Sequence, residues 1–178
     1  MNLFLVKLSL VFLSHLPESN YRKIKSVLSK FNLKQLKNKI MSKPVILCVD
    51  DERMVLDSLR MQLSTAFGSG YKYEAAEDAY EALDLIEELD GENIRVIVII
   101  SDWLMPGIKG DDFLIRVHEQ FPKVVKIMLT GQADEAAINR AKKHANLHSC
   151  LFKPWSESDL RETILSALSQ LNVIGNGE

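Results

Sequence analysis

The chain of 178 residues contains little cysteine, and this scarcity excludes several classes of protein. Only Cys48 and Cys150 occur, which is too few for a small secreted fold held by disulfides, and their spacing matches no zinc pattern. Glycine and proline, at 8 and 5 residues, are too few for a collagen-like or low-complexity chain. With 47% hydrophobic and 26% charged residues, the composition is that of a globular protein with room for one sizeable core.

The first forty residues lack alanine, glycine, aspartate, threonine, cysteine and tryptophan altogether. Residues 1–41 hold eight basic residues against a single acid, Glu18, whereas the remainder holds 14 Lys and Arg against 23 Asp and Glu. Such a charge split predicts two unlike parts that meet near Met41. We therefore divide the chain into a basic extension (1–41), one domain (42–173) and a short tail (174–178).

Three interpretations of the basic extension compete. The apolar stretch 3–13 resembles a targeting segment, but Lys7 interrupts it and no cleavage site follows, so we expect no stable membrane insertion. Residues 21–40 could form a basic amphipathic helix that touches a membrane surface or nucleic acid. We favour the third interpretation: Met41 stands directly before a predicted strand and is the natural start, so that residues 1–40 are a translated upstream extension.

From Met41 onward, short apolar runs alternate with helical patterns. Helices are indicated by apolar residues three or four apart and by capping pairs such as Asp78 with Glu81 and Ser156 with Asp159. The predicted strands are 45–49, 71–76, 96–100, 124–129 and 149–152, and the predicted helices are 52–67, 79–89, 111–120, 133–145 and one that follows Ser156. This (βα)₅ pattern predicts an α/β fold with an open, doubly wound parallel sheet, for which we expect the flavodoxin-like order 2-1-3-4-5.

Polar residues follow the apolar runs at the points where ligands bind in such sheets. Asp50 and Asp51 follow the first strand, Asp102 the third, Thr130 the fourth and Lys153 the fifth. Carboxylates that converge at one edge need a counter-charge, and a set of oxygen ligands without histidine or cysteine suits Mg²⁺. The pattern indicates phosphoryl transfer to a carboxylate, with Asp102 as nucleophile, Mg²⁺ and Lys153 neutralising charge and the Thr130 hydroxyl as donor.

Four motifs in order resemble the receiver domain of two-component response regulators over about residues 44–171. They are Val-Asp-Asp-Glu at 49–52, Ile-Ser-Asp-Trp-Leu-Met-Pro-Gly at 100–107, Leu-Thr-Gly at 129–131 and Phe-Lys-Pro at 152–154. The resemblance implies that Asp102 is the phosphoacceptor from the phosphohistidine of a histidine kinase. It implies that Mg²⁺ is bound by three aspartates and one backbone carbonyl: Asp50, Asp51, Asp102 and the carbonyl of Leu104. It also implies that Thr130 and Lys153 hold the phosphoryl group, that Thr130 moves inward on phosphorylation, and that a cis bond precedes Pro154.

Two positions depart from the pattern of that family. Relatives often place an aromatic switch residue three positions before the lysine, where this chain has Cys150, so we expect the switch to work through Thr130 and Cys150 in another way. Leu104 is apolar where some relatives are polar, and we expect it to shield the acyl phosphate from water and to lengthen its lifetime.

The sequence favours a stand-alone receiver, because only seven residues follow Leu171 and the acidic domain offers no basic nucleic-acid surface. Its output would be a downstream protein that binds around the helix at 133–145, the strand at 149–152 and the last helix. The alternative is a phosphorelay intermediate that passes the phosphoryl group to a histidine phosphotransfer protein. A flavodoxin-like cofactor binder is disfavoured because the acidic loop after the first strand would repel a flavin phosphate.

Several further residues are expected to be structural. Cys48 and Cys150 lie three strand spacings apart in the expected order, about 14 Å, which is too far for a disulfide and fits free thiols in the cytoplasm. Both tryptophans are expected to pack near the loops, the basic run on the fourth helix to be a solvated face, and the histidines to lie in surface or loop positions without clustering. These residues are Trp103 and Trp155, then Arg140, Lys142 and Lys143, then His15, His118, His144 and His148.

Overall fold

The computed structural model describes residues 42–131 and 135–175, with side chains described as far as Leu171. The chain divides before Lys43 into two units, and the unit that begins there contains the five-stranded sheet. Our interpretations of residues 1–40, including His15, lie outside the described residues. Within the described ranges, no helix combines the length and the apolar character that crossing a membrane requires.

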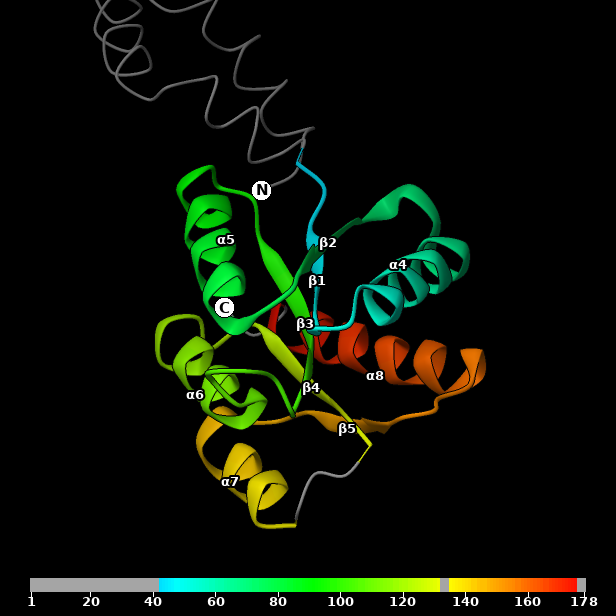
Figure 1. Ribbon diagram of the computed structural model, residues 1–178. Coiled ribbons are helices and arrows are strands. Elements are labelled where there is room, and N and C mark those ends of the chain that lie inside the picture. Colours follow the sequence, from blue (N-terminus) through cyan, green and yellow to red (C-terminus); the bar gives the residue numbers. More distant parts are fainter. Residues whose placement is uncertain (1–41, 132–134, 176–178) are drawn as a thin grey trace, which may run out of the picture. The chain divides into compact units, whose positions relative to one another are not determined.

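Five parallel strands form one sheet in the order β2-β1-β3-β4-β5 (Figure 1). The elements in chain order are β1 (Val45–Val49), α4 (Arg53–Phe67), η1 (Gly68–Gly70), β2 (Lys72–Ala76), α5 (Ala79–Gly91), β3 (Val96–Asp102), α6 (Gly110–Gln120), β4 (Val125–Thr130), α7 (Glu135–Ala145), β5 (Ser149–Phe152) and α8 (Glu157–Gly175). The expected fold class and strand order are confirmed.

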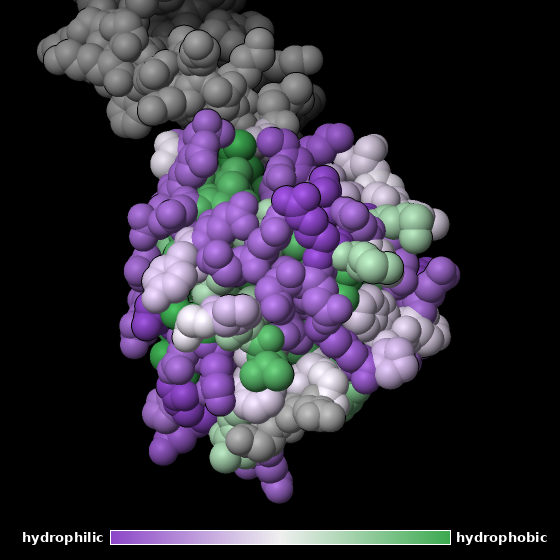
Figure 2. All heavy atoms as spheres, viewed as in Figure 1, coloured by the Kyte–Doolittle hydropathy of each residue, from purple (hydrophilic) through white to green (hydrophobic). Residues whose placement is uncertain are grey.

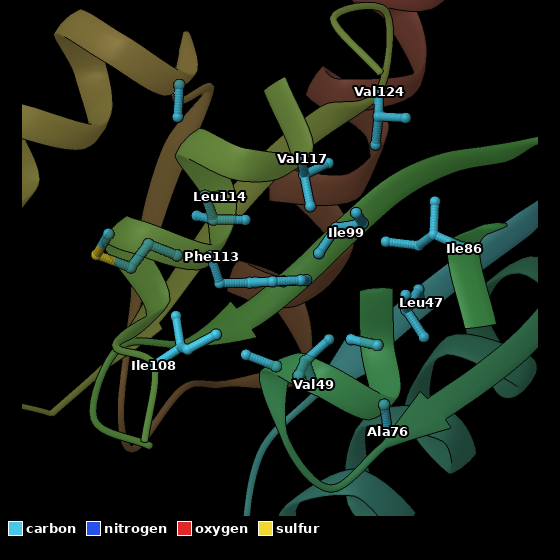
Figure 3. Packing of buried hydrophobic residues seen from close by; sticks show 14 of the residues in the cluster. Leu47, Val49, Ala76, Ile86, Ile99, Ile108, Phe113, Leu114, Val117 and Val124 are labelled. Atoms are coloured by element: carbon cyan, nitrogen blue, oxygen red, sulfur yellow. The ribbon is translucent and has the colours of Figure 1, made fainter. Parts of the chain in front are cut away.

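Helices cover both faces of the sheet, and each face has its own hydrophobic core. Helices α5, α6 and α7 cover one face, while α4 and α8 cover the other (Figure 1). Along β1, Leu47 and Val49 point into the first core, whereas Ile46 and Cys48 point into the second. Figure 3 shows the first core, in which Phe113 of α6 lies among residues of the central strands. Burial on both faces explains why β1 and the first part of β3 are continuous apolar runs rather than alternating patterns.

Several boundaries differ from expectation. Strand β3 continues through Asp102 and β4 through Thr130, so both residues end strands instead of following them. Helix α5 runs to Gly91, beyond the expected end at Leu89, and α8 runs to Gly175, into the part that we assigned to the tail.

The two expected caps behave differently. At α8, Ser156 and Asp159 exchange side-chain-to-backbone hydrogen bonds of 3.1 Å in both directions, which is the predicted capping box. At α5, Asp78 accepts from the N–H groups of the first helical turn, but the Glu81 carboxylate accepts from the N–H of Glu77, one residue before the expected position. The cap at α5 is therefore present in altered form.

The two cysteines are free thiols, as predicted, and they lie in different cores. Cys48 is completely buried with the residues under α4 and α8, whereas Cys150 packs against the core on the other face of the sheet. A disulfide between them is excluded by the sheet itself. Burial raises the pKa of Cys48 to about 12, so this thiol is inert at neutral pH.

The surface seen in Figure 2 is mainly hydrophilic, and apolar residues appear on it as small separate patches. The large hydrophobic side chains that are most exposed in the described domain include Met54 and Leu104, at 86% and 63%. Both stand at the carboxyl-end edge of the sheet, where α4 begins and where β3 ends.

A buried lysine lies inside the fourth strand, which we expected to be apolar. Lys126 of β4 is 0% exposed, and its Nζ lies 2.7 Å from His118 Nδ1 and donates to the carbonyl of Pro122 at 3.3 Å. Burial lowers the pKa of Lys126 to about 8, and burial together with the nearby Lys126 lowers the pKa of His118. We expected a surface or loop histidine: His118 lies on α6, is only partly exposed, and has Lys126 as a partner.

Replacing Lys126 by methionine should stabilise the domain at neutral pH. The protonated lysine is disfavoured by burial, so Lys126→Met should raise the free energy of unfolding by about 1–3 kcal/mol at pH 7. The advantage should shrink as the pH rises from about 8 towards 10.5, because the folded protein then releases a proton that the unfolded chain keeps. Urea unfolding at several pH values measures this, with the exposed Lys72→Met as control. An advantage that does not change with pH would contradict the explanation.

Candidate functional site

The site lies at the edge where the carboxyl ends of the parallel strands meet, and Asp50 is its most buried member. Asp50 follows β1 and is 0% exposed. Its carboxylate accepts from the N–H of Glu52 at 2.9 Å through Oδ1 and from Lys153 Nζ at 2.6 Å through Oδ2. Both oxygens of this buried carboxylate therefore have a donor.

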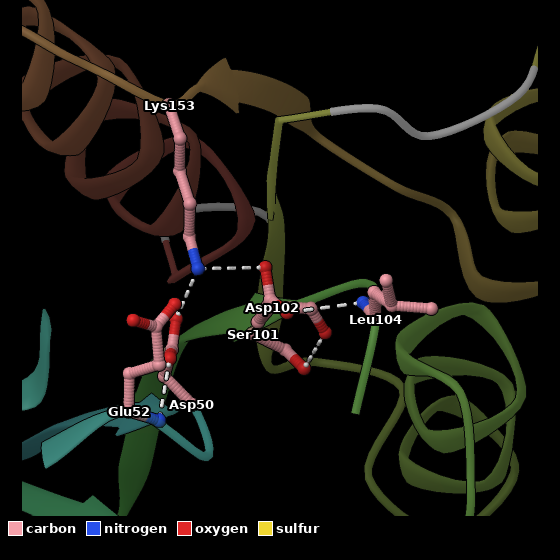
Figure 4. A network of polar contacts seen from close by, with 6 residues as sticks. All are labelled: Asp50, Glu52, Ser101, Asp102, Leu104 and Lys153. Atoms are coloured by element: carbon pink, nitrogen blue, oxygen red, sulfur yellow. Dashed lines mark hydrogen bonds and ion pairs between the residues drawn. The ribbon is translucent and has the colours of Figure 1, made fainter. Parts of the chain in front are cut away.

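Asp102 ends β3, the strand beside β1, and is held in a similar way (Figure 4). Its Oδ1 lies 3.0 Å from Lys153 Nζ, and its Oδ2 accepts from the N–H of Leu104 at 3.0 Å. Each of the two aspartates thus closes a turn onto the backbone N–H two residues ahead, a local pattern that aspartate favours. The side chain of Asp102 is 8% exposed, so its free edge reaches solvent.

Lys153 is placed by the last two strands. It follows β5, and its backbone N–H donates to the carbonyl of Thr130 at the end of β4, at 2.9 Å. The peptide bond to Pro154 is cis, as the resemblance implied. From there the side chain, 21% exposed, extends between Asp50 and Asp102 (Figure 4). A single ammonium therefore contacts two carboxylates that come from separate strands.

Charge and burial compete at this cluster. Burial raises the pKa of Asp102 above its ordinary range, and the hydrogen bond and charge of Lys153 oppose this only in part. For Lys153, burial favours a lower pKa, but the hydrogen bonds to Asp50 and Asp102 outweigh it, and the pKa is raised. The ammonium consequently stays charged at neutral pH, and Asp102 is a more basic carboxylate than an exposed aspartate.

The remaining predicted residues surround this centre to different degrees. Thr130 is buried at the end of β4, and Cys150 is half-buried on β5 with its pKa raised by burial. Asp51 is exposed, and the Leu104 side chain points outward although its N–H binds Asp102. The structure brings together Asp50, Asp102 and Lys153, and it leaves Asp51 outside their contacts. Among residues 42–131 and 135–175, no three His, Cys, Asp or Glu residues stand close enough to hold a metal ion as they are placed.

The donor chemistry nevertheless fits Mg²⁺. Two buried carboxylates share one ammonium, so the cluster keeps one negative charge, and Asp51 adds another beside it. All these groups, with the Leu104 carbonyl, are oxygen ligands, which a hard divalent cation prefers. The expected ligand set, Asp50, Asp51, Asp102 and Leu104, is chemically suited to the ion.

A glycine allows the loop after β3 to fold tightly against the strand end. A Cβ atom at Gly110 would lie 2.1 Å from the Asp102 carbonyl oxygen, so no side chain fits there. The N–H of Gly110 donates to the Trp103 carbonyl at 2.8 Å, and the N–H of Trp103 donates to Leu129 of β4 at 2.9 Å. The start of α6 is therefore fixed directly against the residue that follows Asp102.

Comparison with known proteins places this geometry in a family. The model of the response regulator receiver domain matches residues 46–165, which is more than half of the chain. The chain belongs to this family. Two-component signalling is thus the process in which this domain type takes part.

Individual relatives agree in fold and differ in size. The chain is 30% identical over 131 residues to the hydrogenase transcriptional regulatory protein HoxA of Cupriavidus necator, covering 74% of this chain and 25% of the relative. It is 32% identical over 126 residues to the sensor kinase CckA of Brucella abortus, covering 70% of this chain and 12% of that one. With chemotaxis protein CheY1 of Helicobacter pylori the identity is 28%, covering 67% of this chain and 92% of the relative. The receiver thus spans a quarter or less of the first two relatives.

Solved receiver structures match as well. A signal receiver domain of an HD domain-containing protein from Pseudomonas fluorescens has a TM-score of 0.68 at 29% identity, covering 78% of this chain and 96% of the other. A CheY-like receiver from Methanospirillum hungatei has a TM-score of 0.64 at 30% identity, covering 74% and 98%. The receiver fold therefore accounts for nearly the whole of those two chains.

Sequence reasoning missed a polar network beside the receiver's acidic cluster. Asp111, in the first turn of α6, is 3% exposed and accepts from the Trp103 indole and from Arg140 of α7. Arg140, Lys142 and Lys143 are all exposed, as expected of a solvated face, but Arg140 also pairs with Asp111 and Asp112, which the sequence did not predict. An acidic residue at the start of a helix is usual, and nothing in the sequence linked it to an arginine 29 positions away.

The other predicted structural residues lie as follows. Trp103 packs into the core under α5, α6 and α7, and Trp155 is half-buried with its indole donating to Gln62 of α4 at 3.0 Å. His144 is exposed, while His148 lies 2.6 Å from Gln170 of α8. The expectation of tryptophans packed near the loops is confirmed, and His148 has a tertiary partner that its loop position did not predict.

Replacing Asp102 by asparagine should stabilise the unmodified receiver at neutral pH. The raised pKa means that the folded protein disfavours the ionised carboxylate, and Asn has the same shape without the charge. We expect Asp102→Asn to raise the free energy of unfolding by about 0.5–2 kcal/mol at pH 7. The gain should vanish as the pH falls through the raised pKa, where the aspartate is protonated. Thermal unfolding at pH 7 and pH 4 tests this, and a gain that persists at low pH would contradict it.

Proposed function

We propose that this chain is a response regulator that accepts a phosphoryl group on Asp102 from a histidine kinase and thereby changes its binding to a downstream protein. The observation that carries the proposal is the pairing of Lys153 with both Asp50 and Asp102. The shared cation favours the ionised form of Asp102 against the effect of burial, and the ionised carboxylate is the form that acts as a nucleophile. The pairing also leaves one negative charge without a partner, which a divalent cation bound together with the phosphoryl group would offset.

The chemical step follows from these groups. An oxygen of Asp102 attacks the phosphorus of a phosphohistidine, the P–O bond forms, and the P–N bond breaks. The histidine nitrogen takes the electron pair and then a proton, and Asp102 becomes an acyl phosphate. The ammonium of Lys153 can then bind an oxygen of the transferred phosphoryl group while it keeps its contact with Asp50. The Thr130 hydroxyl can donate a hydrogen bond to another of these oxygens.

Mg²⁺, held by Asp50, Asp51, Asp102 and the Leu104 carbonyl, would supply charge neutralisation for the transferring group when it is bound. The residues of the chain orient the nucleophile. The N–H of Leu104 holds one oxygen of Asp102, and Lys153 holds the other, which restricts the rotation of the carboxylate before the reaction.

The switch would run through Thr130 and the half-buried Cys150 to the surface of α7, β5 and α8, where the downstream protein would bind. Phe152 of β5 is 60% exposed on this part of the chain, which supports a protein contact there. A receiver also occurs with little else in the chain, since the match to CheY1 covers 92% of that protein. The free thiols favour a reducing cytoplasm.

The first test uses a small phosphodonor, acetyl phosphate, with Mg²⁺. Mass spectrometry should find a gain of one phosphoryl group in the wild type and none in Asp102→Asn, and a chelator should abolish the gain. Lys153→Met should slow the reaction by about 100-fold or more, since one stabilising donor of this kind contributes that much. Phosphorylation of Asp102→Asn at the wild-type rate would refute the assignment.

Incubation of the phosphorylated chain with a histidine phosphotransfer protein separates the two outputs. Retention of the label with a changed affinity for a partner supports the switch. Rapid onward transfer to histidine supports the relay alternative.

The lifetime of the acyl phosphate should depend on Leu104. Its side chain is 63% exposed beside Asp102. In the phosphorylated chain we expect it to limit the approach of water to the phosphorus from that side. Leu104→Asn should shorten the lifetime by about 10-fold, because an amide can orient the attacking water. Decay of radiolabel after removal of the donor measures this, with Met54→Gln as the control for loss of an exposed apolar side chain. Equal lifetimes for Leu104→Asn and the wild type would exclude shielding.

A further inference from the structure

The loop that follows the phosphoacceptor is joined to α7 by three side chains in series. The Trp103 indole Nε1 donates to Asp111 Oδ1 at 3.2 Å, and Arg140 donates to Asp111 Oδ2 at 2.7 Å. Trp103 belongs to the loop after Asp102, Asp111 to α6 and Arg140 to α7. The network therefore links an element of the acidic cluster to a helix that contributes no residue to that cluster.

The middle residue of this series is buried, and each of its oxygens has one partner. Asp111 is 3% exposed and Trp103 is 9% exposed, whereas the Arg140 side chain is 46% exposed. A buried carboxylate whose partner is removed is costly, so the two hydrogen bonds to Asp111 depend on each other. A second contact of Arg140, with Asp112, holds the guanidinium against α6.

The Trp103 end of the network fixes the groups that hold the phosphoacceptor. Trp103 lies between Asp102 and Leu104 in the chain, and the Leu104 N–H is a donor to the Asp102 carboxylate. The backbone of Trp103 is tied to β4 through Leu129 and to α6 through Gly110. The indole hydrogen bond adds a side-chain restraint, so the position of the Leu104 N–H depends on where Asp111 holds the ring. The ammonium of Lys109, 5.1 Å from the ring centroid, lies over the same indole.

We propose that Asp111 is a positioning residue that orients the loop of Asp102 through Trp103 and couples that loop to α7 through Arg140. The proposal rests on the proposed function, because the coupled event is phosphorylation of Asp102. Coupling between two sites is reciprocal: if phosphorylation changes the strength of the Arg140 contact, loss of that contact must change the affinity of the site for a phosphoryl group. This route is separate from Thr130 and from the position where Cys150 replaces the aromatic switch of relatives.

The experiment uses the full chain with Trp155→Phe, so that Trp103 is the single tryptophan. Beryllofluoride with Mg²⁺ serves as the probe, since this anion takes the place of a phosphoryl group on a carboxylate. Its affinity is measured by titration, and the indole N–H resonance of Trp103 is followed by nuclear magnetic resonance. Arg140→Gln removes the link to α7, and Lys143→Gln, an exposed lysine on the same helix, is the charge-matched control.

We expect Arg140→Gln to weaken beryllofluoride binding by about five-fold or more and to move the indole resonance, whereas Lys143→Gln changes neither. Asp111→Asn keeps an acceptor for the indole but loses the ion pair, so it should weaken binding as Arg140→Gln does. Combining the two changes should cost no more than either alone, because both remove the same contact. All variants are measured well below their unfolding temperatures, so that lost stability alone changes neither readout.

The outcomes distinguish a failure of the coupling from a failure of the proposed function. If the parent chain binds beryllofluoride and Arg140→Gln has the affinity of Lys143→Gln, the coupling is refuted while the proposed function stands. If the combined variant loses the sum of the separate effects, Asp111 and Arg140 act independently and the series is refuted. If the parent chain neither binds beryllofluoride nor gains a phosphoryl group on Asp102, the proposed function fails, and this inference fails with it.

Discussion

The contact of one ammonium with two buried carboxylates constrains the rest of the receiver. Asp50 follows β1 and Asp102 ends the neighbouring strand β3, so parallel pairing brings two negative charges together where both are buried. Lys153 follows β5, the strand at the edge of the sheet, and its side chain must reach past the end of β4 to neutralise the two carboxylates. Neutralisation of the two carboxylates therefore depends on the strand order, on where β5 ends and on the length of the lysine side chain.

Sequence sufficed for the fold and for this central contact for a simple physical reason. Strands buried on both faces must be continuous apolar runs, as β1 and β3 are, and parallel strands present their carboxyl ends at one edge. Asp50, Asp102, Thr130 and Lys153 could accordingly be placed together from their positions alone. The exposed position of Asp51 could not, because the rotation of a side chain in a loop leaves no periodic pattern.

Polar contacts between separate elements were harder to predict from the sequence. Lys126 lies in β4 among the apolar residues Val125 and Ile127, and its ammonium has its partners, His118 and Pro122, on the preceding helix and loop. Likewise, Asp111 has the character of an ordinary acid in the first turn of a helix until α7 is folded against α6. Polar groups of this kind obtain their partners only from tertiary packing, which composition and periodicity do not encode.

The glycine at the start of α6 divides the loop after Asp102 into two parts with different freedom. At Gly110 the backbone of the helix presses on a strand carbonyl, leaving no volume for even a methyl group. Six residues earlier, the Leu104 side chain extends into open solvent. The residue at position 104 can therefore be exchanged, which changes the chemistry beside Asp102, without altering the close contact of the backbone at Gly110. Among related sequences, position 104 should therefore vary, whereas position 110 should remain glycine.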